Sequence, residues 1–118
     1  MAYRVEIARR AEADLEELYL WVVDRAPQQG ARWFNGLERA VLSLDEHPKR
    51  CPVAPESIDP ERLVRVLSYG RKPSVYRIFF TVDDDARLVR VVHVRRGVRR
   101  PPGSDAGRKS AWASKRSP

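Results

Sequence analysis

The chain has 118 residues, of which 42% are hydrophobic and 33% are charged, and its formal net charge at pH 7 is +7. This length indicates one domain, and this composition is typical of a globular protein rather than a membrane-embedded or fully disordered one. No apolar run approaches the roughly 20 residues that span a bilayer. The N-terminal residues also lack the apolar core of a secretory signal, so we expect a cytoplasmic protein that does not bind membranes.

The positive charge is concentrated in the C-terminal half. Residues 1–61 carry a net charge of −4, whereas residues 62–118 carry +11. A basic half beside an acidic half favours a polyanion or an acidic protein as the partner, although a solvated surface has the same composition. The single cysteine, Cys51, excludes an internal disulfide and a cysteine-based zinc cluster within one chain. We expect no metal and no cofactor.

The first third of the chain predicts a strand followed by two helices. Apolar and polar residues alternate in "YRVEI", which indicates a short strand. The segment "AEADLEELYLWVVD" then has apolar residues at helical spacing. Pro27 separates it from a second amphipathic helix, "PQQGARWFNGLERAVLSLDEH", which Pro48 should end. Because the link is very short, we expect an antiparallel helical hairpin. Its apolar stripes are Leu15, Leu18, Tyr19 and Val22, then Trp33, Phe34, Leu37, Val41 and Leu44.

The rest of the chain predicts three strands after a proline-rich crossover. They cover residues 63–69, 75–82 and 88–94, and the short polar turns between them indicate antiparallel pairing. The order β-α-α-β-β-β predicts an α+β fold. A small antiparallel sheet should pack on one face against the helical hairpin, with the other face partly open. Residues 102–118 are rich in Pro, Gly, Ser and charge, which predicts a disordered, basic tail.

One arginine interrupts the most apolar strand, "VYRIFF". Since side chains alternate along a strand, Ile78 and Phe80 share the better core face, while Arg77 and Phe79 share the other. We therefore expect Arg77 to project from the uncovered face of the sheet. The alternative is that Arg77 pairs with a carboxylate, such as Glu6 or an acid of the helices, and only stabilises the fold.

Two segments together resemble a known family. "YGRKPSVYRIFF" followed by "VRVVHVRRGVRR" is similar to the RelE/ParE superfamily of toxins from bacterial type II toxin–antitoxin systems, also called plasmid stabilisation proteins. The resemblance covers residues 1–101, which we take as the toxin domain, and leaves the tail outside. It implies the fold predicted above and a cognate antitoxin as partner in a hetero-oligomer. RelE-like members cut mRNA on the ribosome, whereas ParE-like members inhibit DNA gyrase and have no nuclease activity.

The resemblance also implies roles for individual residues. In RNA cleavage the ribose 2′-OH attacks the adjacent phosphate, so cations must stabilise the growing charge, and the planar fork of arginine matches two phosphate oxygens. The candidate catalytic residues are Arg77, Arg71, Lys72 and Arg96. The candidate substrate-binding residues are Arg95, Arg99, Arg65 and Tyr69.

The sequence departs from the family at one position of this pattern. Many relatives read "HVRHG", whereas this chain reads "HVRRG", with Arg96 where a histidine can act as general acid. Arginine stays protonated in proteins and is a poor proton donor. We expect His93 to be structural and His47 to have no chemical role. The basic half favours mRNA cleavage on the ribosome, gyrase inhibition is the alternative, and a third reading is a degenerate domain kept as an interaction module.

Overall fold

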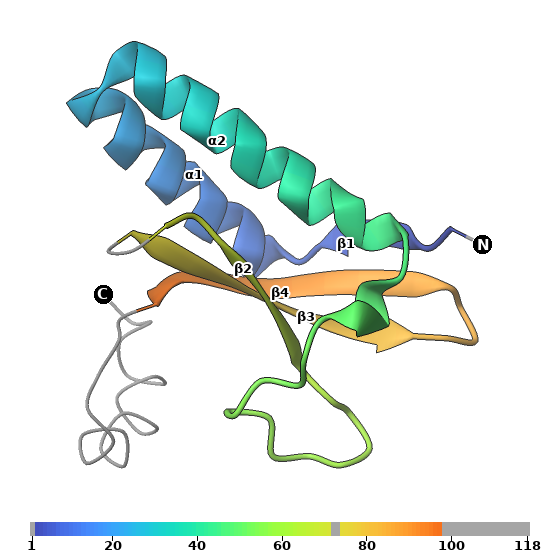
Figure 1. Ribbon diagram of the computed structural model, residues 1–118. Coiled ribbons are helices and arrows are strands. Elements are labelled where there is room, and N and C mark those ends of the chain that lie inside the picture. Colours follow the sequence, from blue (N-terminus) through green and yellow to red (C-terminus); the bar gives the residue numbers. More distant parts are fainter. Residues whose placement is uncertain (1, 72–73, 98–118) are drawn as a thin grey trace, which may run out of the picture.

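A computed structural model describes residues 2–71 and 74–97 of the chain (Figure 1). Two helices pack together on one face of a four-stranded sheet, which confirms the predicted α+β fold. None of the described helices is long and apolar enough to cross a membrane. The elements in chain order are β1 (Arg4–Ile7), α1 (Arg9–Arg25), α2 (Pro27–Leu42), the 3₁₀ turns η1 (Ser43–Asp45) and η2 (Pro48–Arg50), β2 (Arg65–Tyr69), β3 (Val75–Asp83) and β4 (Leu88–Gly97).

The sheet is mixed, with the strand order β1-β4-β3-β2. The pairings β2–β3 and β3–β4 are antiparallel, as predicted. The first strand instead joins the far edge and runs parallel to β4, with Arg4 opposite Leu88. That pairing was not predicted, because no local pattern in a strand of four residues states which edge it joins. It places the start of α1 beside the middle of β4.

The second helix is shorter than predicted. We expected it to continue to residue 47, but α2 ends at Leu42 and the chain tightens into η1 and η2. His47 adopts a left-handed backbone with φ 49°, and Arg50 donates hydrogen bonds to the carbonyls of Glu46 (2.7 Å) and His47 (3.1 Å). Past Leu42 the backbone makes 3₁₀ hydrogen bonds instead, from the Glu46 N–H to the Ser43 carbonyl (3.2 Å) and from the Arg50 N–H to the His47 carbonyl (3.0 Å), so the α-helix gives way to two tight turns.

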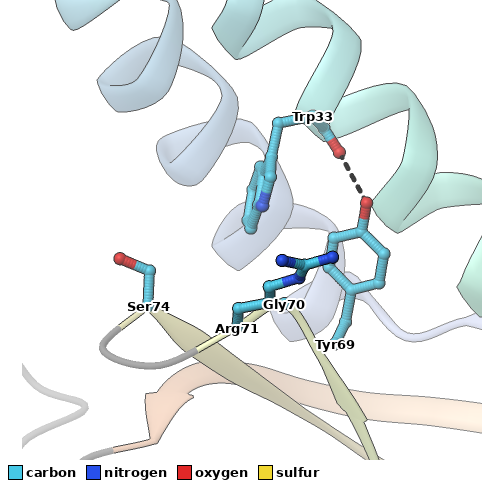
Figure 2. A pocket seen from close by; sticks show the side chains of 5 residues that line it. All are labelled: Trp33, Tyr69, Gly70, Arg71 and Ser74. Carbon is cyan, nitrogen blue, oxygen red and sulfur yellow. Dashed lines mark hydrogen bonds between the residues drawn. The ribbon is translucent and has the colours of Figure 1, made fainter.

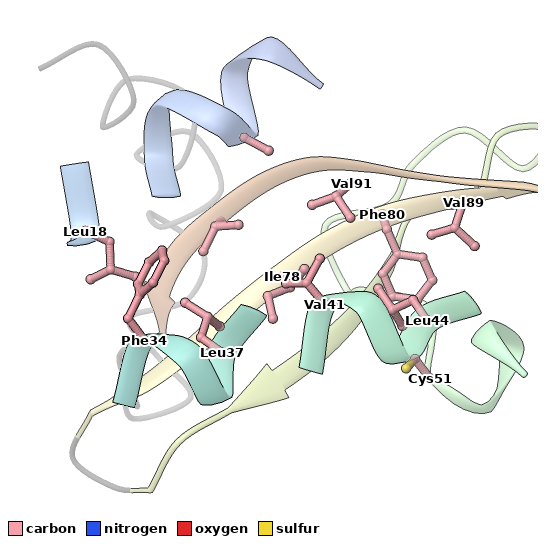
Figure 3. Close-up of a cluster of buried hydrophobic side chains, with 12 residues drawn as sticks. Leu18, Phe34, Leu37, Val41, Leu44, Cys51, Ile78, Phe80, Val89 and Val91 are labelled. Carbon is pink, nitrogen blue, oxygen red and sulfur yellow. The ribbon is translucent and has the colours of Figure 1, made fainter. Parts of the chain in front are cut away.

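The main core lies between the helices and the sheet (Figure 3). Leu37 and Val41 of α2 are buried against Ile78 and Phe80 of β3, so the predicted core faces of these elements are confirmed. A β-bulge follows Phe79 in the β3–β4 ladder and resets the register between the two strands. The twelve buried members of this core are Ala11, Leu18, Phe34, Leu37, Val41, Leu44, Cys51, Ile78, Phe80, Val89, Val91 and Val94.

We call the side of the sheet turned away from α1 and α2 the outer face. It is less open than predicted, because the crossover segment 52–64 folds beneath it (Figure 1). Ala54 from this segment is buried against Val66 of β2 and Phe79 of β3, forming a small second cluster. The prediction treated the segment as a plain connection, since its prolines and polar residues show no apolar period. Ala54 packs this segment against the sheet, Glu56 pairs with Arg77, and the backbone N–H of Val66 in β2 donates to the Pro52 carbonyl.

Candidate functional site

Arg77 lies on the outer face, as the strand alternation predicted, but it is already bound to a carboxylate. Its Nη1 is 2.8 Å from Oε2 of Glu56, and its Nη2 is 3.1 Å from Oε1, so the ion pair is bidentate. The Arg77 and Glu56 side chains are 25% and 21% exposed. Arg77 therefore projects from the outer face and is also paired with a carboxylate. That carboxylate belongs to segment 52–64, and not to β1 or the helices.

The surroundings of Arg77 hold its side chain across the sheet. Its guanidinium carbon lies 4.9 Å from the centre of the Phe79 ring, a cation–π contact. Gly97 of β4 provides the space for its stem, because a Cβ there would lie only 2.9 Å from the Arg77 Cδ. Ser68 of β2 and Arg95 of β4 are its neighbours in the ladder on either side. Arg77 is thus fixed by packing as well as by charge.

Glu56 remains ionised in this arrangement. Burial alone would raise the pKa of its carboxyl, but the hydrogen bonds from Arg77 and the charges of Arg77 and Arg95 lower that pKa below its ordinary value. A carboxylate with a lowered pKa is a weak base. The geometry therefore makes Glu56 an anion that neutralises Arg77, and a poor acceptor for a substrate proton.

A second feature lies on the helix side of the sheet, at the end that carries the β2–β3 turn. Figure 2 shows Arg71 beside Trp33 of α2 and Tyr69 of β2, and these line a hollow of about 540 Å³ together with Gly70 and Ser74. The Tyr69 hydroxyl donates to the Trp33 carbonyl oxygen at 3.1 Å. The Trp33 ring contacts the Tyr69 ring edge-on, with centroids 5.4 Å apart. We call this hollow the aromatic cleft.

Arg96 lies near the aromatic cleft as well. It is opposite Tyr76 in the β3–β4 ladder, and the Tyr76 ring packs edge-on against Trp33 at 5.3 Å. Burial raises the pKa of the Tyr76 hydroxyl, and the charge of Arg96 opposes that shift. The aromatic cleft is therefore lined by the rings of Trp33 and Tyr69 and by the cation Arg71, while Tyr76 and Arg96 lie beside it.

The structure separates the residues that we grouped as one catalytic site. Arg77 and Arg95 lie on the outer face, whereas Arg71 and Tyr69 line the aromatic cleft on the opposite side of the sheet. Arg65 donates hydrogen bonds to the carbonyls of Cys51 (2.7 Å) and Lys49 (3.5 Å), so it fixes the turn that precedes the crossover. Lys72 and Arg99 fall outside the described residues.

The histidine of the last strand is built into the fold. His93 is 5% exposed, and its Nδ1 lies 2.5 Å from Oδ2 of Asp14 in α1. The same Asp14 oxygen accepts the backbone N–H of Val94 at 3.0 Å, and the His93 ring stacks on Phe79 with centroids 6.0 Å apart. This contact ties α1 to β4 just beyond the end of β1. His47, in contrast, is exposed at the turn between η1 and η2.

Sequence reasoning missed two residues of this site, Glu56 and Asp14. Asp14 lies among the acids near the start of α1, where negative charge is favourable for the helix by itself, and Glu56 lies in a loop without periodicity. Both contacts join residues far apart in the chain, with separations of 79 residues for Asp14–His93 and 21 for Glu56–Arg77. No local signal could have paired them.

Known proteins resemble this chain in sequence and in fold. Residues 5–101 match the family described as ParE toxin of type II toxin-antitoxin system, parDE. Toxin RelE1 of Caulobacter vibrioides is 29% identical over 93 residues, which are 79% of this chain and 95% of that relative. The chromosomal ParDE toxin–antitoxin system from P. aeruginosa superimposes with a TM-score of 0.64 at 22% identity, covering 83% of this chain and 98% of that chain. The E. coli toxin RelE, as a mutant in the free state, superimposes with a TM-score of 0.56 at 19% identity over 100% of both chains.

Proposed function

We propose a function from one premise: the chain belongs to the ParE toxin family of type II toxin–antitoxin systems. It is thus a toxin of the RelE/ParE kind. We propose that it arrests growth by binding an essential protein, DNA gyrase, and that it performs no chemical step itself. The sequence alone favoured mRNA cleavage, but the arrangement of the groups that could move a proton favours gyrase inhibition.

The observation that supports this proposal is the engagement of His93. Cleavage through the ribose 2′-OH needs a group that accepts a proton and another that donates one. His93 is buried and hydrogen-bonded to Asp14. A substrate that approaches from solvent therefore cannot reach its ring. Glu56 is held as an anion by Arg77 and is a weak base. Among the described residues, the outer face therefore presents cations to a substrate, but no accessible general acid or general base next to these cations.

A second candidate function, mRNA cleavage on the ribosome, is favoured by a different observation. Arg77 and Arg95 face each other across β3 and β4 on the outer face, and arginines there suit the charge of a phosphate in a transition state. Electrostatic stabilisation alone contributes a large share of many rate enhancements. This candidate requires that Glu56 leave Arg77 when substrate binds.

We further propose that a cognate antitoxin neutralises the toxin by covering cationic surface. The aromatic cleft suits such a partner, because Trp33 and Tyr69 offer apolar contact while Arg71 offers charge. An antitoxin segment with acidic and aromatic or aliphatic side chains would match both. Tryptophan, tyrosine and arginine are the residue types that most often contribute a large share of the binding energy of an interface.

The two functions are separated by purified protein in two assays. Titrated into a gyrase supercoiling reaction, the full chain should block supercoiling and accumulate cleaved DNA. In a reconstituted translation reaction, primer extension on the reporter transcript should find the mRNA intact. Ribosome-dependent cuts in the transcript, together with unaffected supercoiling, would refute gyrase inhibition and establish the second candidate.

A matched variant sharpens the comparison. Arg77→Gln removes the outer-face cation and leaves the aromatic cleft in place. Gyrase inhibition should survive this change, whereas mRNA cleavage would be lost, since it depends on charge at the phosphate. Arg39→Gln is the control, because Arg39 is an exposed arginine of α2, on the other side of the sheet from Arg77.

A further inference from the structure

The outer-face cation Arg77 already has a ligand, and that ligand belongs to the chain itself. Both carboxylate oxygens of Glu56 accept from the two terminal nitrogens of Arg77, at 2.8 and 3.1 Å. This is the fork geometry with which arginine also binds two oxygens of a phosphate. Glu56 therefore occupies the donors that an external oxyanion would use. The charge of Arg95 also acts on Glu56, so two cations share this one carboxylate.

The segment that carries Glu56 is attached to the sheet by few buried contacts. Residues 52–64 form no helix or strand, apart from one isolated bridge between Val53 and Arg65. Ala54 is the buried member of this segment in the second cluster, and Val64 packs against the cluster partly buried; the cluster has three buried residues, against twelve in the main core. At the tip, Ile58 is 90% exposed. Moving this tip would leave the helix–sheet core untouched.

The ends of the segment are held more firmly than its tip. The backbone N–H of Ala54 donates to the Val64 carbonyl at 2.8 Å, and that of Val66 donates to the Pro52 carbonyl at 3.0 Å. These bonds close the base of the loop. Beside Glu56, the Ser57 N–H donates to the Ala54 carbonyl at 2.9 Å and the Ser57 hydroxyl accepts from the Val64 N–H at 3.0 Å, so exchange requires motion of the Glu56 side chain rather than of the base. The Arg77–Glu56 pair is partly exposed on both sides, and solvent screens such a pair. The loop is thus built so that Glu56 can be exchanged while its base stays in place.

We propose that Glu56 is a resident competitor for the anion site formed by Arg77 and Arg95, and that a nucleic-acid phosphodiester binds there only by displacing Glu56. In the resting chain the site is closed. A strand that brings a phosphate to Arg77 must release the Glu56 carboxylate into solvent, and the tip of segment 52–64 moves with it. The inference does not depend on the target of growth arrest, because it concerns what the outer face binds.

A nucleic acid fits this site better than an acidic protein does. Exchanging the Glu56 carboxylate for one from another protein replaces an ion pair by an equivalent one, with no gain in charge neutralisation. A nucleic-acid strand instead presents several phosphates, and Arg77, Arg95 and Arg90 project from two neighbouring strands of the outer face. Binding to several cations at once releases counterions from the strand, which favours association.

The test is the affinity of the full chain for a single-stranded uridine oligomer of about 12 nucleotides, a length within the usual range for such sites. Fluorescence anisotropy would compare Glu56→Gln with Glu61→Gln, because Glu61 is an exposed acid of the same segment. Both variants remove one negative charge and so raise the net charge by one. Glu56→Gln should bind about fivefold more tightly than Glu61→Gln, since removing the competitor raises the fraction of open sites.

Two further variants separate local competition from a general effect of charge. In the double variant Glu56→Gln with Arg77→Gln, the gain in affinity should vanish, because the uncovered cation is gone. Glu56→Asp keeps the net charge but shortens the side chain, so it should weaken the pair with Arg77 and bind the oligomer more tightly than the wild type. It also serves as the test if Glu56→Gln does not fold, as judged by circular dichroism.

The proposal is overturned by any of three results. Glu56→Gln or Glu56→Asp could bind no more tightly than its reference, which would mean that Glu56 does not compete. The gain could survive the loss of Arg77, which would place the nucleic acid elsewhere. Hydrogen exchange could show segment 52–64 equally protected with and without the oligomer, which would mean that bound RNA leaves Glu56 in place.

Discussion

Two carboxylates decide how the charged residues of the last strands behave. Asp14 accepts from His93 and from the Val94 backbone, and Glu56 accepts from both terminal nitrogens of Arg77. Each carboxylate is partly buried, at 18% and 21% exposed, and each is compensated by direct hydrogen bonds. Buried polar groups are tolerated only when they are satisfied in this way. Single residues far away in the chain thus determine that His93 is structural and that Arg77 is occupied.

The first prediction concerns the pH dependence of stability. Burial alone would raise the pKa of Asp14, but hydrogen bonds from His93 and Val94 lower it below its ordinary value, and the pKa of Glu56 is lowered by Arg77. Because a carboxyl with a lowered folded-state pKa binds its proton more readily when unfolded, its stabilising effect is complete above the unfolded pKa. That effect disappears as pH falls through the folded pKa. Urea unfolding should therefore show stability falling below about pH 4.

The variant Asp14→Asn tests the Asp14 share of this acid sensitivity. It should be less stable than the wild type at about pH 6 and should lose less stability on acidification, because the carboxyl that titrates is gone. Glu16→Gln is the control, since Glu16 is an exposed acid of the same helix and should keep the wild-type profile. Parallel pH curves for Asp14→Asn and the wild type would contradict the assignment.

At the scale of elements, the closeness of α1 and α2 depends on one glycine. Gly30 is buried in the first turns of α2, and a Cβ there would lie 2.4 Å from the carbonyl oxygen of Val22 in α1. By local propensity alone, a glycine at this position weakens its helix relative to alanine. The structure gives its reason, which is that the two backbones approach too closely for any side chain. The hairpin therefore owes its geometry to a residue that its local propensity disfavours.

The second prediction uses this conflict between propensity and packing. Alanine is favoured over glycine inside a helix by about 1 kcal/mol, whereas an added methyl in a closed contact costs about 1–3 kcal/mol. Because the contact is with backbone, which cannot rotate away, Gly30→Ala should lower the free energy of unfolding by about 1–2 kcal/mol. Gln28→Ala, at an exposed position of the same helix, should be neutral or slightly stabilising. A Gly30→Ala protein more stable than wild type in urea would rule out the close approach.

For the molecule as a whole, the sheet separates two different surfaces. The helix side of the sheet holds the main core and, at one end, the aromatic cleft. The outer face carries Arg77, which segment 52–64 partly covers. The predicted gathering of cations from separate strands is correct for Arg77 and Arg95, but acids accompany them. Glu56 pairs with Arg77, and Glu6 lies 3.8 Å from Arg90. The molecule therefore offers one surface suited to a protein partner and one whose charge is partly neutralised internally.

The third prediction concerns the extent of the folded domain. Within residues 2–71 and 74–97, every residue that packs in the main core lies between Tyr3 and Val94, and the match to the toxin family ends at residue 101. A chain that ends at Pro101 should therefore unfold in urea with a free energy within about 0.5 kcal/mol of the full chain, as is usual for changes away from packed residues. A chain that ends at Val92 is the matched control, because it removes Val94 from the core and should not fold. A marked loss of stability in the longer truncation would mean that residues 102–118 contribute to the fold.

Local patterns in the sequence were enough to predict the kind of elements, their order and the face that each buries. Apolar residues recur about every 3.6 residues in a helix and every 2 residues in a strand. The helical stripes and the alternation around Arg77 therefore depend only on the order of neighbouring residues in the chain. The family also followed from the sequence, because "YGRKPSVYRIFF" and "VRVVHVRRGVRR" are contiguous patterns.

Only the tertiary structure decided what the charged residues do. Three contacts join segments that are distant in the chain: the parallel pairing of β1 with β4 and the pairs Asp14–His93 and Glu56–Arg77. The end of α2 at Leu42 depends on the turns that follow the helix. The period of a sequence pattern predicts whether a side chain is buried or exposed, but it does not predict which atoms the side chain contacts. Charge and hydrogen-bond partners are set by those contacts, and they form only when the sheet, the helices and the crossover are packed together.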